Sequence, residues 1–433
     1  MKNKLTSYLF LTVACLAVAL PEPSGAENPP ESSALPQKDD GGSDWDALLA
    51  KARAGDARAQ TQLGIRYGQG NGVKQDYEKA AQWLMKAAQQ GDADAQFTLA
   101  GCYAQGKGVP LDTEKAIEWT RKSALQGFAP AQFNLGLFYY NNKREEPGNA
   151  QKAREWWTKA AQQGNADAQN ALGIMYMEGT SVEQDLKKAV EWFKKSAEQN
   201  LVEAQVALGH CYLEGKGVRQ DYGKAVEWYK KAVEQGFADA QIELGNCYYY
   251  GMGVEQDYDE AVKWYLEAAE QKNAVAMYNI ALCLIEGKGI DQNNELAFKF
   301  LKASAKKGDE DAKFLLSECY AIGIGVVKDE QKALELWEEA VQQGSTNSLF
   351  RLGCLYYEGT IVPHDPGKAL ELWLEAAKKE NPAAQLTLGR LDLKGVIMPV
   401  KLDQIMQWLE QSAEKGDADA REILQWLKKR HSL

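Results

Sequence analysis

Histidine is scarce in this chain: its 433 residues contain only three, His210, His364 and His431. They lie far apart and show no metal-ligand spacing such as H-E-x-x-H. No other cofactor motif accompanies them. We therefore expect neither a metal nor a cofactor.

Catalytic motifs are also lacking. Ser304 and Ser412 each begin an S-x-x-K sequence, but neither S-D-N nor K-T-G accompanies them. The Gly-Lys-Gly sequences at 215–217 and 287–289 follow predicted helices rather than strands, and G-x-x-x-x-G-K-[ST] is absent. We interpret these glycines as turns and predict that the protein is not an enzyme.

Runs of basic residues are missing too. The chain has 50 Lys and Arg against 61 Asp and Glu, for a formal net charge of −11. Removal of the predicted leader described below, which carries Lys2, Lys4 and Glu22, would bring the charge to −12. An acidic chain without a basic cluster lacks the electrostatic footprint for nucleic acid or anionic lipid. We expect neither as a partner.

Long apolar runs are limited to Leu9–Leu20, which is too short to span a bilayer comfortably. Lys2 and Lys4 precede this run, and Ser24-Gly25-Ala26 follows it with small residues. This order is typical of a secretory signal. Residues 1–26 are therefore predicted to be a signal peptide cleaved after Ala26, which makes the protein secreted or periplasmic, with no membrane span after cleavage.

Two alternatives remain open for the N-terminus: a lipoprotein signal that uses Cys15, and an uncleaved anchor. Thr12 stands where a lipoprotein signal usually has leucine. Residues 27–43 are rich in Pro, Ser, Gly and charge, and offer almost nothing to bury. We expect them to form a disordered linker.

The rest of the chain, residues 44–433, is built from a repeat of 36 residues. Ten copies are present with a half copy at the end; they begin at Gly55, Gly91, Gly127, Gly164, Asn200, Gly236, Lys272, Gly308, Gly344, Glu380 and, for the half copy, Gly416. A fixed period of this size is the signature of a solenoid, in which each repeat contacts only its neighbours.

Each copy is predicted to form two helices. In the first copy, Asp56 and Asp76 can cap the helices, and Gly70 and Gly72 can form the turn between them. Helical spacing predicts a buried face made of Ala59, Leu63, Tyr67, Ala80, Trp83, Ala87 and Ala88. The third copy is one residue longer and lacks the glycine turn. We interpret its loop as a tolerated variant, with a bend or a partner-contact loop as the alternative.

The repeat resembles a known family. The second copy contains Ala93, Ala95, Gln96, Leu99, Tyr103, Gly106, Gly108, Val109, Asp112, Lys115, Ala116 and Trp119. This pattern is similar to the Sel-one-like repeat (SLR), a relative of the tetratricopeptide repeat, and the similarity covers about residues 44–433. The resemblance implies an all-α, right-handed α-solenoid of about ten helix-turn-helix repeats that holds other proteins together.

Six cysteines follow the leader, and the first five occupy the same place in their repeats. Equivalent helices of a stack lie about 8–10 Å apart, whereas a disulfide needs Cα atoms within about 7 Å. Cysteine-rich members of the family pair cysteines between adjacent helices, but this chain lacks the second partner. We expect buried, reduced thiols at Cys102, Cys211, Cys247, Cys283, Cys319 and Cys354.

One face of the first helices is the candidate binding surface. If Ala240 and Leu244 face the core, Ile242, Asn246 and Tyr249 point the opposite way, and the resemblance implies that this face lines a concave groove. Across the repeats the row contains Phe133, Leu137, Tyr140, His210, Asn246, Tyr249, Tyr278, Phe314, Phe350 and Tyr357, with Tyr250 beside it.

We interpret the three phenylalanines of this row as packing residues. The predicted partner contacts are Tyr140, His210, Asn246, Tyr249, Tyr250, Tyr278 and Tyr357. Tyrosine combines a large contact area with a hydroxyl at low entropic cost, which suits binding hot spots.

The sequence thus predicts a monomeric scaffold or adaptor that binds a protein or peptide ligand in its groove. Two alternatives remain: a module that binds cell-wall glycan or peptidoglycan fragments, and a hydrolase of the β-lactamase type. The hydrolase would need a cluster of polar residues that the sequence does not show.

Overall fold

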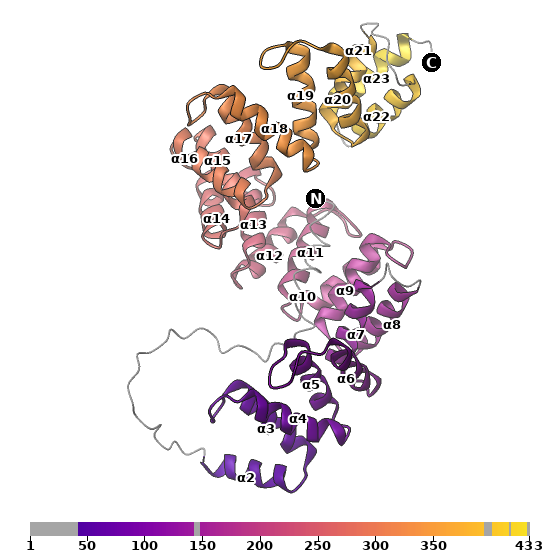
Figure 1. Cartoon of the computed structure of the whole chain (residues 1–433). Coiled ribbons are helices and arrows are strands. Elements are labelled where there is room, and N and C mark those ends of the chain that lie inside the picture. Colours follow the sequence, from indigo (N-terminus) through magenta and orange to yellow (C-terminus); the bar gives the residue numbers. More distant parts are fainter. Residues whose placement is uncertain (1–41, 143–147, 394–400, 415–416, 431–433) are drawn as a thin grey trace. The chain divides into compact units, whose positions relative to one another are not determined.

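The computed structural model describes residues 42–142, 148–393, 401–414 and 417–430. The predicted signal peptide and nearly all of the predicted linker lie outside this part of the chain. Within it every regular element is a helix, which confirms the all-α prediction. The helices follow one another as antiparallel pairs in a solenoid (Figure 1). No described helix has the length and apolar character needed to cross a bilayer.

The described helices form two compact units, which divide between Gln235 and Gly236. Unit 1 opens with α2 (Gly42–Arg53), the helix that packs on the first repeat. The first helices of its five repeats are α3 (Ala57–Gln69), α5 (Ala93–Gln105), α7 (Ala129–Asn141), α9 (Ala166–Glu178) and α11 (Val202–Glu214). The second helices are α4 (Tyr77–Gln89), α6 (Thr113–Leu125), α8 (Asn149–Gln162), α10 (Leu186–Ala197) and α12 (Tyr222–Val233).

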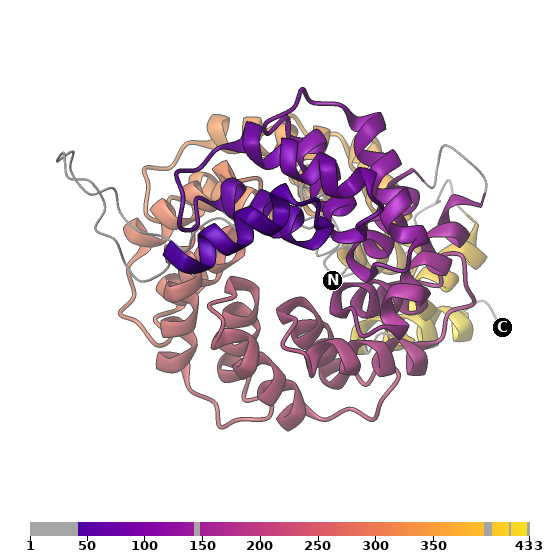
Figure 2. The same cartoon turned by 90° about the horizontal axis from the view of Figure 1, so that it is seen from below.

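Unit 2 repeats the same plan, and Figure 2 shows its pairs from another side. Its first helices are α13 (Ala238–Tyr250), α15 (Ala274–Glu286), α17 (Glu310–Ile322), α19 (Thr346–Glu358) and α21 (Pro382–Leu393). Its second helices are α14 (Tyr258–Glu270), α16 (Asn294–Lys306), α18 (Glu330–Gln342), α20 (Pro366–Lys378) and α22 (Leu402–Glu414). The half repeat supplies α23 (Ala418–Arg430), a first helix without a second, as expected.

The caps predicted from the sequence are present. The side chain of Asp56 accepts a hydrogen bond from the backbone N–H of Ala59 at 2.7 Å, and that of Asp76 from Lys79 at 2.9 Å. Gly70 ends α3 in the left-handed conformation, with φ of 72°. These bonds satisfy backbone groups that a helix end would otherwise leave without partners.

Two glycines of the repeat are required by close packing. Gly108 lies in a turn, where a Cβ would overlap the carbonyl oxygen of Tyr77 at the start of the preceding second helix. Gly245 lies inside α13, where a Cβ would come within 2.6 Å of the ring of Tyr265 in α14. The first glycine allows neighbouring repeats to stack, and the second makes room for a large side chain between paired helices.

The core differs from the predicted one in two ways: Tyr67 and Trp83, predicted to be buried, are only partly buried, and Leu137 and Ile242, predicted on the open side, are buried. Leu84, the neighbour of Trp83, is the fully buried residue of α4. Ile242 is buried because the next repeat covers it. Phe133, Phe314 and Phe350 pack against the core, as expected.

The six cysteines in the described part of the chain are all free thiols. Five of them are buried, as the sequence predicted, and Cys354 is half-buried. Cys354 differs because it lies one residue earlier in its repeat than the other five. Burial raises the pKa of Cys102 to about 11 and that of Cys211 to about 12. A buried thiol of this kind is a small apolar side chain rather than a nucleophile.

Candidate functional site

The second, sixth, ninth and thirteenth residues of the first helices form a stripe that we call the open face. In α13 these residues are Asp239, Glu243, Asn246 and Tyr250, and all four are at least partly exposed, while the residues between them are mostly buried. The stripe follows from the 3.6-residue period of a helix whose other sides pack on its own repeat and on its neighbours.

Tyr250 is the most exposed aromatic side chain of the open face in unit 2, at 66%. Its ring lies 4.9 Å from that of Tyr249, in an edge-to-face arrangement. Tyr249 also lies edge-to-face with Tyr258 at 5.0 Å. The exposed ring therefore rests on a small aromatic cluster, and such pairs are stabilising beyond the area they bury.

Tyr249 is held from the next repeat. Its hydroxyl donates to Glu286 Oε2 at 2.7 Å and accepts from Lys288 Nζ at 3.3 Å, and Lys288 pairs with Glu286 at 2.8 Å. The bonds from Lys288 and then from Tyr249 lower the pKa of Glu286. Burial, followed by the bond to Glu286, raises the pKa of Tyr249 to about 12. Tyr249 is thus a neutral support for Tyr250 at physiological pH.

Asn246 and Tyr278 are the other predicted contacts near this cluster. Asn246 accepts a hydrogen bond from the hydroxyl of Tyr265 at 2.8 Å and donates to Glu243 at 3.3 Å. Tyr278 is half-buried; burial raises its pKa to about 12, with smaller contributions from Asp311, Asp309 and Tyr250. Both side chains are therefore largely engaged within the fold.

Tyr357 is 48% exposed, and its ring lies 5.4 Å from that of Trp373. Sequence reasoning missed two exposed apolar residues of the open face, Ile322 and Trp426. Ile322 is the thirteenth residue of α17, the place that Tyr250 occupies in α13. Trp426 is the ninth residue of α23, the place of Asn246. A tabulation of these places along the repeats could have identified both.

The two predicted partner contacts in unit 1, His210 and Tyr140, are less exposed to a ligand than Tyr250. His210 Nδ1 lies 3.1 Å from the hydroxyl of the buried Tyr229. Tyr140 is only 3% exposed and packs against Trp157 with ring centroids 5.2 Å apart. The interpretation of Tyr140 as an exposed contact was wrong, because this residue lies between its own second helix and the following repeat.

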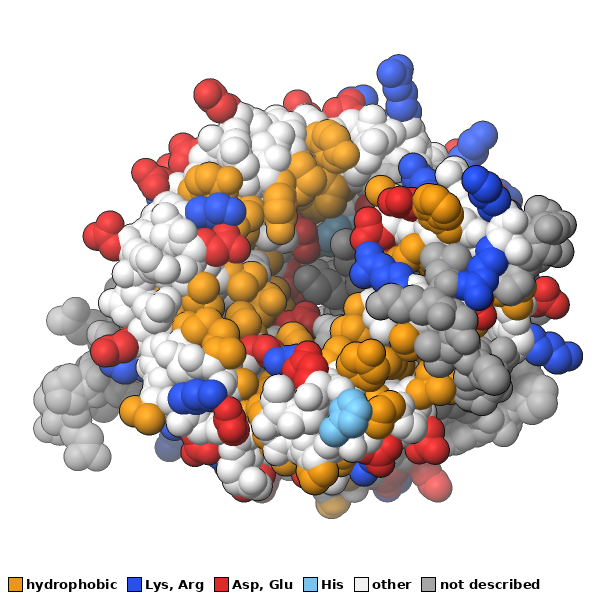
Figure 3. All heavy atoms as spheres, turned by 90° about the horizontal axis from the view of Figure 1, so that it is seen from above, with side chains coloured by type: hydrophobic (Ala, Val, Ile, Leu, Met, Phe, Trp, Pro, Cys, Tyr) orange, Lys and Arg blue, Asp and Glu red, His pale blue; other side chains and the backbone are white. Residues whose placement is uncertain are grey.

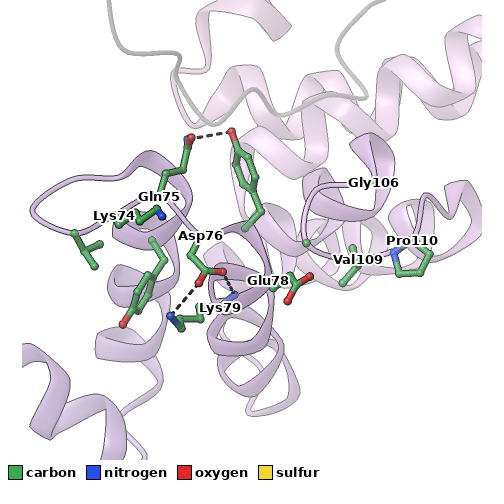
Figure 4. A pocket seen from close by; sticks show the side chains of 12 residues that line it. Lys74, Gln75, Asp76, Glu78, Lys79, Gly106, Val109 and Pro110 are labelled. Atoms are coloured by element: carbon green, nitrogen blue, oxygen red, sulfur yellow. Dashed lines mark hydrogen bonds and ion pairs between the residues drawn. The ribbon is translucent and has the colours of Figure 1, made fainter. Parts of the chain in front are cut away.

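A hollow of about 900 Å³ lies among the turns of the first two repeats (Figure 4). Tyr67, Tyr77 and Val109 line it together with polar side chains. Asp76 caps α4 and pairs with Lys79 at 3.0 Å, and Gln75 bonds to Tyr77 at 3.0 Å. These polar groups already complete the helix start and the turn. We therefore attribute the hollow to the stacking of turns rather than to a ligand site.

Charges of both signs are interspersed on the face shown in Figure 3, with hydrophobic side chains between them. This face has no continuous basic area of the kind that binds nucleic acid. Among the described residues, no group of three or more His, Cys, Asp or Glu side chains is placed to hold a metal ion.

The solved structures that are similar to this chain include two proteins with the same kind of repeat. The first is a protective antigen of uropathogenic Escherichia coli with an SLR fold: identity is 28%, the TM-score is 0.60, and the match covers 89% of this chain and 90% of that one. The second is a Sel1 repeat protein from Oxalobacter formigenes: identity is 35%, the TM-score is 0.52, and the match covers 56% of this chain and 98% of that one. No curated protein sequence matches.

The model of the Sel1 repeat matches ten successive segments, which together span residues 57–417. Its copies have the predicted period and begin two residues later than the boundaries chosen from the sequence. Ten repeats in register cover most of the described solenoid. The chain belongs to the Sel1 repeat family, whose helical-repeat fold generally serves as a scaffold for protein–protein interaction.

Proposed function

We propose that this protein is a secreted or periplasmic adaptor that acts as a monomer and binds a polypeptide on the open face of the first helices of unit 2. The observation that supports the proposal is Tyr250, which is 66% exposed and yet held in place by Tyr249. An exposed ring on a rigid support loses little conformational entropy when it is covered. Ile322 and Tyr357 extend the apolar contacts along the same unit.

Export is part of this proposal and depends on residues 1–26, which lie outside the described structure. If they are a cleaved signal peptide, N-terminal sequencing of protein recovered from the envelope or medium will give Glu27 as the first residue. An N-terminus at Met1, or a lipid on Cys15, would replace the proposed soluble form with an anchored one.

Photo-crosslinking tests the binding surface. A benzophenone amino acid at position 250 is expected to crosslink to a polypeptide in envelope and secreted extracts. The same amino acid at Tyr222, which is 40% exposed on the second helix α12, is the control. The proposal predicts a discrete polypeptide adduct at 250 and none at 222. Equal labelling at the two positions, or no adduct at 250, would contradict it.

A companion variant separates binding from folding. Tyr250→Ala is expected to lower the free energy of unfolding by no more than about 1 kcal/mol, because the ring is mostly exposed and loses chiefly its edge-to-face contact with Tyr249. It should remove capture of the crosslinked polypeptide. The exposed aromatic rings also suit a glycan ligand, so the capture is repeated after enzymatic removal of carbohydrate from the extract. Loss of capture under that treatment would favour the glycan-binding alternative.

A further inference from the structure

Two carboxylates occupy the same place in neighbouring repeats of unit 1. Asp167 is the second residue of α9, and Glu203 is the second residue of α11. Both are partly buried on the open face, and neither forms an ion pair with a described residue. Burial raises the pKa of both groups, and the charge of Asp167 raises that of Glu203 further. The fold therefore holds two like charges together without a counter-charge.

Two buried oxygen atoms at this place have no hydrogen-bond donor within the described part of the chain. They are Glu203 Oε2 and Asn170 Oδ1. Asn170 is only 9% exposed and lies three residues after Asp167, so the two side chains are neighbours on one surface of α9. A buried acceptor without a donor costs about 1–3 kcal/mol, and structures contain few of them.

The equivalent position in another repeat indicates what lies beside the side chain of Asn170. It is the fifth residue of its first helix, and that place faces the start of the next first helix. In the first repeat the fifth residue, Thr61, bonds to the cap residue Asp92 at 3.0 Å. In the pair α9–α11 the cap residue is Leu201, which provides no side-chain cap bond. By the same correspondence, the side chain of Asn170 lies beside the beginning of α11, the part of that helix that contains Glu203.

Asp167, Asn170 and Glu203 therefore present oxygen acceptors, with two negative charges when both carboxyl groups are ionised. A water molecule could donate to the oxygens but would leave the charge uncompensated. The group contains two carboxylates, and no third His, Cys, Asp or Glu side chain is placed with them among the described residues to hold a metal ion. A cation with several N–H donors matches both the charge and the hydrogen bonds, and bonds between charged partners are the strong ones.

We propose that Asp167, Asn170 and Glu203 bind an alkylammonium or guanidinium group, supplied by a lysine or arginine side chain of the polypeptide ligand. The assignment of this group to a polypeptide ligand rests on the proposed function, whereas the proposal that the three residues bind a cation does not. Asp167 and Glu203 are partly exposed on the open face of unit 1, where a bound chain can reach them, and Asn170 lies beside Asp167 beneath this face. Proton uptake by the carboxyl groups competes with the cation, so binding strengthens as the pH rises.

NMR spectroscopy of the mature chain tests the site without knowledge of the partner. Protein labelled with ¹⁵N-asparagine carries a reporter in the side-chain amide of Asn170, which is assigned from its loss in Asn170→Ala. The probes are n-butylammonium, ethylguanidinium and tetramethylammonium at low salt. We expect a saturable shift of the Asn170 amide with the first two probes and none with tetramethylammonium, which carries the charge but donates no hydrogen bond.

Charge-neutral variants complete the test. Glu203→Gln should weaken butylammonium binding at least tenfold. Glu214→Gln, in the same helix but at a carboxylate that already pairs with Lys216, should change binding less than twofold. The absence of a saturable shift in the unmodified protein, an equal response to tetramethylammonium, or equal losses in the two variants would each overturn the site.

The source of the cation is tested separately. A capped Gly-Lys-Gly peptide should bind at least as tightly as butylammonium if the natural ligand is a polypeptide, because its backbone can reach the rest of the open face. Tighter binding of the free amine would overturn the polypeptide source while the cation site stood. Failure of crosslinking at Tyr250 would instead contradict the proposed function and leave this result unchanged.

Discussion

The second helices of the two units carry different surfaces on the same framework. In unit 1 each has a partly buried tryptophan with a lysine three residues later, whose ammonium lies 4.0–4.5 Å from the ring centroid: Trp83–Lys86, Trp119–Lys122, Trp156–Lys159, Trp192–Lys195 and Trp228–Lys231. In unit 2 the corresponding pairs are Trp264–Glu267, Phe300–Ala303, Leu336–Glu339, Leu372–Glu375 and Trp408–Gln411. Lysine is thus present in none of the five pairs of unit 2, and glutamate takes its place in three of them.

The physical reason lies in what a half-exposed tryptophan needs. The lysine stem covers apolar ring surface while its charge interacts with the ring face. Leu336 and Leu372 bring less apolar surface to the same place, so no cation is needed over them. We call the position of this tryptophan and that of the lysine three residues later the outer positions of the second helix. Packing inside each helix pair maintains the fold, whereas the residues at the outer positions can change in size and charge between the two units.

The largest expected losses of stability should be the same in both units, because glycines in the turns allow neighbouring repeats to pack closely in each unit. In Gly217 and Gly289 a Cβ would overlap a carbonyl oxygen of the preceding second helix, and φ is 73° and 67°. Gly217→Ala and Gly289→Ala should each lower the free energy of unfolding by about 2–4 kcal/mol. Urea denaturation measures the change.

Gly91→Ala is the matched control for this pair. Gly91 also has a positive φ, of 92°, but a Cβ there would meet nothing within 4 Å. Only the conformational cost of about 1–2 kcal/mol should appear. If the three variants were equally destabilised, backbone conformation rather than the contact between repeats would account for the glycines.

Replacement of the tryptophan or leucine at the outer position by alanine should lower the free energy of unfolding by different amounts in the two units. Trp192→Ala in unit 1 removes a large ring that packs on the core, and should cost about 2–3 kcal/mol. Leu336→Ala in unit 2 removes a smaller, partly buried side chain, and should cost about 1–2 kcal/mol. Equal losses would mean that the tryptophan adds nothing to the stacking of unit 1.

The lysine should contribute less than the ring it covers. Lys195→Gln should cost about 0.5–1 kcal/mol, because its ammonium lies 4.5 Å from the Trp192 ring. Lys194→Gln changes the same charge beside it, but Lys194 pairs only with Glu198, at 3.9 Å on the surface. Thermal unfolding of the two variants measures the difference, and a larger loss for Lys194→Gln would refute the role of the ring contact.

The partly buried carboxyl group of Glu203 in unit 1 should make the free energy of unfolding depend on pH. Because the pKa of Glu203 is raised in the fold, the folded state keeps the proton to a higher pH than the unfolded state. The free energy of unfolding should therefore fall as the pH rises through this range. Glu203→Gln should become increasingly stabilised relative to the unmodified protein over the same range. A curve for Glu203→Gln that stays parallel to that of the unmodified protein would exclude the effect.

The smallest expected difference between the units is in the rate at which their cysteine thiols react with a labelling reagent. At pH 8 the half-buried Cys354 of unit 2 should react with iodoacetamide at least tenfold faster than the buried Cys211 of unit 1. In denaturant all six should react without prior reduction, since none forms a disulfide. Mass spectrometry of the peptides measures both. Protection of any pair in denaturant would show a disulfide.

Much of this fold could be predicted from the sequence, because its determinants are local. The repeat period and the capping residues Asp56 and Asp76 act within a few residues of their partners. The glycine turns follow from backbone conformation, which is also local. The candidate site was predicted less well: Tyr249, Tyr250 and Tyr140 lie in the same part of their repeats, yet one is a bonded support, one is exposed and one is buried.

The sequence by itself determined that the chain forms helix pairs and where each begins and ends; it predicted six buried cysteines, and five of them are buried. Only the tertiary structure decided which open-face side chains remain available. Exposure there depends on the residue that the next repeat brings alongside, about 36 positions away. Glu286 engages Tyr249 in this way, and Leu201 leaves Asn170 without the cap residue that Thr61 finds in Asp92. Helical periodicity gives the direction of a side chain, whereas its neighbours come from the packing of repeats.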